Sequence, residues 1–286
     1  MTAPLSEQAP AKINLTLRVI GRRADSYHML ESLVAFADLA DTLTLVPDGE
    51  ATLTTTGPFA AACGPAADNL VLKAANALGA RIVNLRAGRF QLDKQIPVAG
   101  GIGGGSTDAG TALRLLARAN NLALNDARLA EAAKSVGADV PVCLDPRSRV
   151  MRGIGEELSA PIALPQLPAL LVNPGVLLST RDVFAAFTGP PSDQGELGGV
   201  PVEREALLAV LGSHGNDLTD AAIACTPVIA EVLRALRSLP DARLVRMSGS
   251  GPTCFALFNT AREAAAAAAK LKAAHPGWWL HTGSLG

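Results

Sequence analysis

The segment that most constrains this chain is a run of glycines between an expected strand and an expected helix. Five of the six residues in Gly100–Gly105 are glycine, and Ser106 follows them. The segment 89–96 alternates as a strand does, whereas 108–119 has the apolar spacing of a helix. Glycines let several backbone N–H groups turn toward one point, and the helix that follows adds its positive end. The loop is therefore predicted to bind an anion such as a phosphate group.

Two other glycine-rich signatures fit this loop less well. The dinucleotide-binding pattern GxGxxG fails because Ser106 stands where its third glycine belongs. The Walker pattern GxxxxGK[ST] has its glycines at 100 and 105, but Ser106 again replaces the phosphate-binding lysine. A flexible surface linker is the third interpretation, and linkers rarely join a strand to a strong helix. A nicotinamide- or flavin-dependent oxidoreductase is therefore the weakest of the functions considered.

The composition and the spacing of the metal-binding residue types exclude several classes of protein. With 49% hydrophobic and 18% charged residues, the chain can bury a large core. A net charge of −1 argues against extensive nucleic-acid binding. The four cysteines form no CxxC pair and the histidines lack metal-ligand spacing, so no metal site is predicted. Residues 1–10 lack the pattern of a secretory signal and no long apolar stretch is present, so a cytoplasmic protein is expected.

The order of the expected elements predicts an α+β fold with two lobes. Strands and helices alternate irregularly, and no internal repeat of solenoid length is present. The segment Pro161–Pro168 contains three prolines and is a plausible boundary. The predicted lobes are therefore residues 1–160 and 161–286.

Three separated motifs make the chain resemble the GHMP kinase superfamily. The glycine loop resembles the family's second motif, Pro10–Leu15 its first, and Met247–Thr253 its third. Gly21–His28 is similar to a block found in one branch of the family, whose substrate carries a cytidine diphosphate group. Further similar blocks are Asp68–Val71, Gly137–Pro141, Gly153–Glu156 and Asn216–Leu218. The resemblance extends from about residue 9 to residue 258.

This resemblance implies a fold and a nucleotide site. The N-terminal lobe would resemble the second domain of ribosomal protein S5, the C-terminal lobe would be ferredoxin-like, and the substrate would lie between them. The enzyme would move the terminal phosphoryl group of ATP to a substrate hydroxyl, with Mg²⁺ bridging the phosphates. The implied nucleotide contacts are Gly100, Gly101, Ile102, Gly103, Gly104, Gly105, Ser106, Asn69 and Lys94.

The resemblance also implies two catalytic residues. Asp139 would accept the proton of the attacking hydroxyl, and Lys12 would lie close enough to keep Asp139 ionised and to stabilise the developing alkoxide. The residues alone favour a simple turn former before Pro141 for Asp139. They likewise favour a surface lysine for Lys12.

A third set of residues is implied for the substrate. Tyr27, the only tyrosine in the chain, would stack on a nucleobase, and His28 would hydrogen-bond the base edge. The resemblance makes this base cytosine, with Phe184 as its second stacking face and Asn14 nearby. Without the resemblance, core packing explains Phe184 and interface packing explains Tyr27.

Three positions depart from the family pattern. Ser26 and Ala99 replace glycines, and Asp108 stands where asparagine is commoner. Ala99 precedes the anion-binding loop and should have little effect, whereas Asp108 would repel a phosphate group if it faced the ligand.

Two alternatives remain open, together with the oligomeric state. The first is another small-molecule kinase of the family, acting on homoserine, mevalonate or a sugar. The second is a non-catalytic nucleotide-binding relative, against which the presence of both Lys12 and Asp139 argues. Monomer and homodimer are equally compatible with the sequence.

Overall fold

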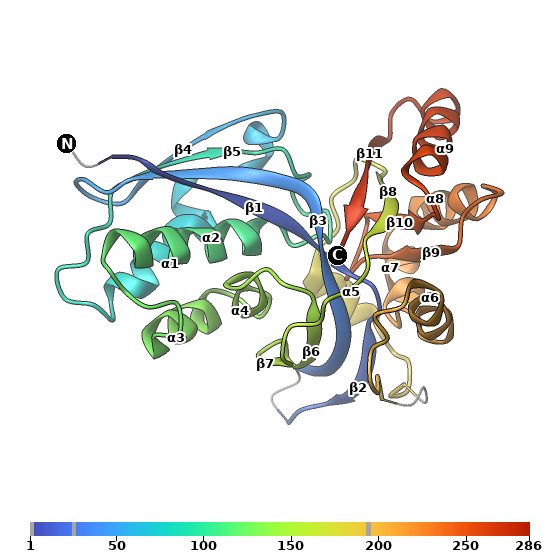
Figure 1. The fold of residues 1–286 in the computed structure, drawn as a ribbon, viewed down its shortest axis with the longest axis horizontal. Coiled ribbons are helices and arrows are strands. Elements are labelled where there is room, and N and C mark those ends of the chain that lie inside the picture. The colour runs from blue at the N-terminus through green and yellow to red at the C-terminus, as the bar shows by residue number, and fades with distance from the viewer. Residues whose placement is uncertain (1–2, 25–26, 193–195) are drawn as a thin grey trace. The chain divides into compact units, whose positions relative to one another are not determined.

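The computed structural model describes residues 3–24, 27–192 and 196–286. The chain folds as two compact units, and each unit is made of three stretches that alternate along the sequence. The first unit contains Met1–Lys12, Leu39–Val98 and Gly103–Pro146. The second contains Ile13–Asp38, Ala99–Ile102 and Arg147–Gly286. Both units mix helices with strands (Figure 1), which confirms the predicted α+β class. The lobe boundary predicted at residue 160 stays a prediction.

The first unit packs helices against a small mixed sheet. Within it β5 pairs antiparallel with the last part of β3 and parallel with β4. Phe90 and Leu92 of β5 are buried together with Leu113 of α2, because alternate residues of the strand face the helices. The elements are β1 (Leu5–Asn14), β3 (His28–Val46), β4 (Thr52–Thr56), η1 (Ala60–Cys63), η2 (Ala66–Asp68), α1 (Leu70–Gly79), β5 (Arg89–Asp93), α2 (Gly104–Ala119), α3 (Ala127–Val136) and α4 (Val140–Cys143).

Two boundaries in this unit differ from the sequence-based expectation. The strand expected over 89–96 ends at Asp93, because the backbone N–H groups of Gln95 and Ile96 bind the Asp41 carboxylate instead of a neighbouring strand. The helix expected over 108–119 begins at Gly104, inside the glycine run.

The second unit contains a four-stranded antiparallel sheet in the order β11–β8–β10–β9. Figure 1 shows α8 and α9 beside these strands, and apolar side chains of both helices share a core with β8 and β10. This order, with α8 before β9 and α9 before β11, is that of a ferredoxin-like lobe and confirms the prediction. The elements are β2 (Arg18–Arg22), β6 (Arg149–Gly153), β7 (Glu157–Leu158), β8 (Leu167–Asn173), α5 (Thr180–Ala186), α6 (Arg204–Ser213), α7 (Thr219–Cys225), α8 (Val228–Arg237), β9 (Leu244–Met247), β10 (Cys254–Leu257), α9 (Ala261–Ala274) and β11 (Trp279–Leu285).

A second group of strands in this unit carries the Gly21–His28 block. The first part of β3 pairs antiparallel with β2 on one side and with β6 on the other, and β6 continues to β7. Positions 25 and 26, including the Ser26 departure, lie outside the described residues. His28 therefore begins a strand that has a neighbour on each side.

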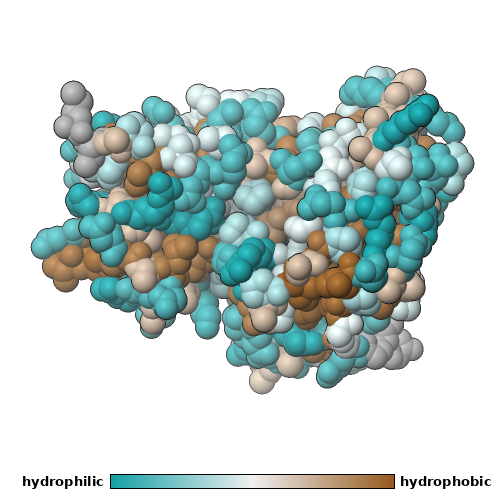
Figure 2. All heavy atoms as spheres, in the orientation of Figure 1, coloured by the Kyte–Doolittle hydropathy of each residue, from teal (hydrophilic) through white to brown (hydrophobic). Residues whose placement is uncertain are grey.

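The face drawn in Figure 2 has apolar residues (brown) gathered at the lower left and right of centre, among hydrophilic residues (teal). Within the described residues, Val83 in the first unit and Leu177 in the second are the most exposed large apolar side chains, at 90% and 77%. Apolar atoms make up a large share of the surface of most globular proteins. Across 3–24, 27–192 and 196–286, no helix combines the length and the apolarity that a membrane crossing requires.

The contact between α2 and α4 gives a first test of this fold. A Cβ atom added at Gly110 would lie 2.5 Å from the backbone oxygen of Cys143, so Gly110→Ala must push the two helices apart. We expect a loss of about 2 kcal/mol in the free energy of unfolding, measured by urea titration.

The matched control is Gly79→Ala at the end of α1, where the nearest atom to the new Cβ is 3.9 Å away. Because alanine favours helix and meets no obstacle there, this variant should be unchanged or more stable, by up to about 1 kcal/mol. Equal stability changes in the two variants would contradict the tight helix contact.

Candidate active site

The glycine loop ends in the first turn of α2. Gly101 and Gly103 have φ angles of 72° and 66°, a left-handed conformation that glycine adopts without strain. Gly103 is the N-cap of α2, and the first N–H groups of a helix have no acceptor within the helix. The backbone at Gly104, Gly105 and Ser106 is therefore suited to bind an anion, as the sequence predicts.

Lys12 and Asp139 form an ion pair beside this helix start. The Lys12 ammonium nitrogen lies 2.9 Å from Asp139 Oδ2, which confirms that the two residues are close. A Cβ atom at Gly103 would be 2.9 Å from Lys12 Cβ, so the backbone of Gly103 packs directly on the lysine side chain. Lys12 is 3% exposed and Asp139 38%. The pair therefore presents an accessible carboxylate held by a buried cation.

Helix α2 also fixes the segment that carries Asp139. Asp139 is the N-cap residue of α4, and the last residue of that short helix is Cys143. The Arg114 guanidinium of α2 donates to the Cys143 backbone oxygen at 2.8 Å, next to the close approach at Gly110. One helix thus positions both the glycine loop and the carboxylate.

Asn69 and Lys94 belong to the same unit as the helix start. The Asn69 side chain caps α1 by accepting from the N–H of Val71 at 3.0 Å. A Cβ atom at Gly104 would lie 3.0 Å from the Lys94 ammonium nitrogen, so the lysine side chain packs against the backbone of Gly104. Lys94 is only 3% exposed. Its ammonium group is therefore directed at protein groups within the first unit.

Those groups are two carboxylates, which form with Lys94 a buried charge cluster. Lys94 donates to Asp41 and, at 2.7 Å, to Asp108. Burial would lower the pKa of Lys94, but both carboxylates raise it above its usual value. Burial, together with the Asp41 carboxylate, raises the pKa of Asp108 to about 7 against the effect of Lys94. Asp108 is 1% exposed, and its Oδ1 has no hydrogen-bond partner.

This cluster answers one question that the sequence left open. Asp108 faces Lys94 inside the first unit, so its carboxylate is not a surface group of the loop. Asp41 was not predicted, because a single acidic residue in a strand carries no signal of a partner 53 positions away.

A separate group of residues surrounds Asn14 in the second unit. The Asn14 side chain donates to Ser32 Oγ at 2.7 Å, and its backbone N–H donates to Ser248 Oγ at 3.1 Å. Ser248 Oγ in turn donates to the backbone oxygen of Gly101 at 3.0 Å. A Cβ atom at Gly249 would lie 3.1 Å from Asn14 Oδ1, which is buried and has no partner. The first, second and third motifs therefore meet at Asn14, which keeps an unused acceptor.

His28 is surrounded by aromatic rings. It stacks on Phe184, with ring centroids 5.3 Å apart, and meets the edge of Phe187 at 5.7 Å. Burial and the nearby Arg22 guanidinium lower the pKa of His28, so its imidazole is neutral near pH 7. A neutral imidazole both donates and accepts hydrogen bonds. Tyr27 is 60% exposed.

Phe187 is the residue of this group that the sequence analysis missed. It follows Phe184 by three positions, the helical spacing that places both rings on one face. A cavity of about 550 Å³ adjoins this ring and is also lined by Pro190, Ser192 and Asp217.

Two family models match separate parts of the chain. The family model "GHMP kinases N terminal domain" matches residues 69–145, and "GHMP kinases C terminal" matches residues 204–277. The first match contains the glycine loop and Asp139, and the second contains the Met247–Thr253 turn. The motifs and the family models therefore point to the same fold.

Individual relatives match over nearly their whole length. A 4-diphosphocytidyl-2-C-methyl-D-erythritol kinase of Rhodopseudomonas palustris (strain BisB18) is 56% identical, with 99% of this chain and 95% of the relative covered. The kinase of the same name from Methylobacterium radiotolerans is 55% identical, with 96% and 97% covered. A crystal structure of 4-(cytidine 5'-diphospho)-2C-methyl-D-erythritol kinase has a TM-score of 0.78 and 34% identity, with 99% of each chain covered. A homoserine kinase from Cytophaga hutchinsonii shares the fold, with a TM-score of 0.74 at 18% identity and 99% and 95% coverage.

The buried charge cluster predicts a pH dependence of stability. Asp108 has a pKa of about 7 in the fold against its ordinary 3.8. Between these values the folded state keeps a proton that the unfolded state has released, so stability falls as the pH rises, by at most about 1.4 kcal/mol per pH unit. Asp108→Asn should remove this contribution, as measured by urea unfolding at a series of pH values.

Asp126→Asn is the control for this measurement. Asp126 caps α3 and pairs with Arg128, which holds its pKa at about 2, below the window of interest. This variant should keep the pH slope of the wild-type protein. An unchanged slope in Asp108→Asn would show that Asp108 is ionised throughout the window.

Proposed function

Since the chain belongs to the GHMP kinase family, we propose that it phosphorylates the 2-hydroxyl of 4-diphosphocytidyl-2-C-methyl-D-erythritol with ATP, a step in the non-mevalonate route to isoprenoid precursors. Relatives named for this activity share 52–56% of their residues with it over almost the whole chain. The observation in the structure that carries the proposal is the accessible carboxylate of Asp139, paired with buried Lys12 beside the start of α2.

In this mechanism Asp139 is the general base. Phosphoryl transfer depends on positioning and on neutralising charge, and the attacking hydroxyl must lose its proton. Asp139 accepts that proton. Lys12, fixed against the carboxylate at 2.9 Å, offers positive charge to the developing alkoxide.

The nucleotide is bound by the loop from Gly100 to Ser106, through its backbone N–H groups. Asn69, at the start of α1, contacts the adenosine. The Lys94 ammonium group already pairs with two carboxylates, Asp41 and Asp108. Its charge therefore acts on the phosphate groups from a distance and not through a direct contact. Mg²⁺ would neutralise phosphate charge. No three His, Cys, Asp or Glu side chains of the described ranges gather to hold a metal, so the nucleotide would supply much of the ion's coordination.

The cytidine end of the substrate is recognised by the aromatic group around His28. Tyr27 and Phe184 stack on the cytosine, and the neutral imidazole of His28 hydrogen-bonds its edge. Asn14 belongs to the substrate site in this proposal, although its side-chain oxygen is buried under Gly249 in the structure. The reaction needs neither nucleic acid nor a membrane, and we place it in the cytoplasm. A monomer and a homodimer are both compatible with it.

The deciding experiment measures ADP release from ATP and Mg²⁺ with four separate substrates. Turnover is expected with diphosphocytidyl methylerythritol and not with homoserine, mevalonate or galactose. Turnover with one of the other alcohols alone would retain the kinase and overturn the cytidine substrate. ATP binding without any turnover would favour a non-catalytic relative.

Removal of the general base tests the mechanism. Asp139→Asn should lower kcat about 10²- to 10⁴-fold, because the attacking hydroxyl loses its proton acceptor, while ATP binding measured by calorimetry stays within about threefold. Asp126→Asn makes the same chemical change at another N-cap of the first unit and should retain full activity. Near-normal turnover in Asp139→Asn would reject this base.

Removal of the imidazole tests the substrate site. His28→Ala should raise the KM for the cytidine substrate about tenfold or more and leave the KM for ATP within about twofold. His281→Ala, on β11 of the same unit, removes an imidazole that contacts Asp38 and should change neither KM. A parallel rise of both KM values in His28→Ala would contradict cytosine recognition.

A further inference from the structure

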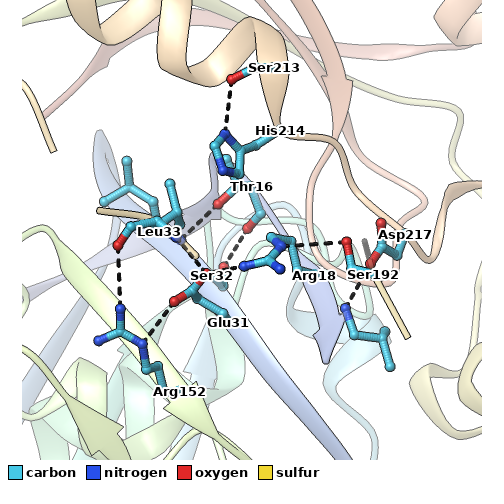
Figure 3. A network of polar contacts seen from close by, with 12 residues as sticks. Thr16, Arg18, Glu31, Ser32, Leu33, Arg152, Ser192, Ser213, His214 and Asp217 are labelled. Atoms are coloured by element: carbon cyan, nitrogen blue, oxygen red, sulfur yellow. Dashed lines mark hydrogen bonds and ion pairs between the residues drawn. The ribbon is translucent and has the colours of Figure 1, made fainter. Parts of the chain in front are cut away.

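Two arginines and a glutamate lie side by side across three strands of the second unit. Glu31 of β3 is directly opposite Arg18 of β2 and directly opposite Arg152 of β6. Arg18 donates to Glu31 Oε1 at 2.5 Å and Arg152 to Oε2 at 2.8 Å, so the carboxylate lies between two guanidinium groups (Figure 3). We call these three residues the arginine–glutamate row. Arg18 and Glu31 are almost completely buried.

Burying such charges is costly, and it rarely stabilises a fold more than apolar packing would. Burial alone would raise the pKa of Glu31, but the Leu197 N–H and the two arginines lower it, so the carboxylate stays ionised. An ionised carboxylate accepts stronger hydrogen bonds than a neutral group. The further hydrogen bonds of these three side chains therefore indicate what the row does in the fold.

Each member of the row also bonds to the segment between α5 and α6. The N–H of Leu197 donates to Glu31 Oε1 at 2.8 Å, and Arg152 donates to the Leu197 backbone oxygen at 3.4 Å. Arg18 donates to Ser192 Oγ at 3.4 Å, as Figure 3 shows. The N–H of Ser192 donates to the Val19 backbone oxygen of β2 at 2.7 Å. Both described ends of the segment, at Ser192 and Leu197, are thus attached at the row.

This segment begins at the aromatic group around His28. Phe184 lies in α5, and Phe187 follows its last residue, five positions before Ser192. Pro190 and Pro191 lie between them, and their fixed φ angles stiffen the connection. Neighbouring residues of a strand face opposite sides, so Leu30, which packs against the same apolar core as Phe184 and Phe187, faces away from Glu31. Between Phe187 and Ser192 the chain therefore passes from the aromatic side of the strands to the edge of β2, where Ser192 bonds to Val19 and to Arg18.

We propose that the arginine–glutamate row positions Phe184 and Phe187 against His28, and that it thereby sets the affinity for the cytidine base. The proposal rests on the proposed function, because it takes this aromatic group as the contact of the base. Arg18, Glu31 and Arg152 are positioning residues and need not touch the substrate. Without the row, the described part of the segment would lose the side-chain hydrogen bonds at Ser192 and Leu197 and would keep the backbone bond from Ser192 to Val19.

Glu31→Gln is the variant that tests this role. The amide keeps the shape of the carboxylate but must turn its NH₂ group toward a guanidinium or toward the Leu197 N–H, so a donor faces a donor. We expect faster hydrogen exchange, by mass spectrometry, in peptides that end at Ser192 and in longer peptides that contain Leu197 in their interior. The KM for the cytidine substrate should rise about tenfold, with kcat and the KM for ATP within about twofold.

Glu7→Gln is the matched control. Glu7 in the first unit is also a carboxylate between two arginines, Arg114 at 2.8 Å and Arg118 at 2.7 Å. This variant should change neither the exchange of the segment nor the KM for the cytidine substrate. Should Glu31→Gln fail to fold, Arg152→Gln removes the partly exposed end of the row and leaves the Arg18–Glu31 pair in place. It should give the same changes to a smaller degree.

The outcomes separate this proposal from the proposed function. Failure of the wild-type protein to phosphorylate the cytidine substrate overturns both. Wild-type turnover with an unchanged cytidine KM in the folded Glu31→Gln protein overturns only the positioning. Equal rises of both KM values, or unchanged exchange at Ser192 and Leu197, likewise overturn it. Faster exchange together with a selective rise of the cytidine KM supports it.

Discussion

The close packing around the first two turns of α2 is the constraint on which the rest of the first unit depends. Gly103 packs on Lys12, Asp108 binds Lys94, and Gly110 contacts the backbone of α4. Two of these contacts require glycine, because an added Cβ would lie 2.9 Å from Lys12 Cβ at Gly103 and 2.5 Å from the Cys143 backbone oxygen at Gly110. The helix is therefore a fixed reference from which the ion pair and the anion-binding turn are both placed.

Each unit contains a buried cluster in which one charged side chain pairs with two of the opposite sign. In the first unit one lysine lies with two carboxylates, and in the second one carboxylate lies between two arginines. Neither arrangement is a simple neutral pair, and each is attached to a stretch of chain without regular structure. The hydrogen bonds of buried charged groups are strong and directional. In irregular segments they therefore fix the position of a backbone that apolar packing alone would leave free to shift.

The order of the expected elements predicted the fold class, and the resemblance to the kinase family implied the ferredoxin-like lobe and the nearness of Lys12 to Asp139. The early start of α2, directly after the left-handed Gly103, was missed because glycine is a poor helix former. Asp41 and Glu31 were missed for another reason. Each is one acidic residue in a strand, and its partners are defined by strand register and by loops far along the chain. Phe187 could have been predicted from the sequence, since it follows Phe184 at helical spacing.

The way the two units divide the chain has a consequence for synthesis on the ribosome. The first unit is complete once residue 146 has been made, whereas β3 of the second unit waits for β6, and its Ala37 pairs with Leu285 at the very end. The seven consecutive residues 31–37 are all buried in the finished protein. β2 precedes this stretch in the chain and can pair with its beginning, but the partners in β6 and β11 are made much later. Until they emerge, one edge of a largely apolar strand lacks its neighbours, and such edges are typical sites of chaperone binding and aggregation.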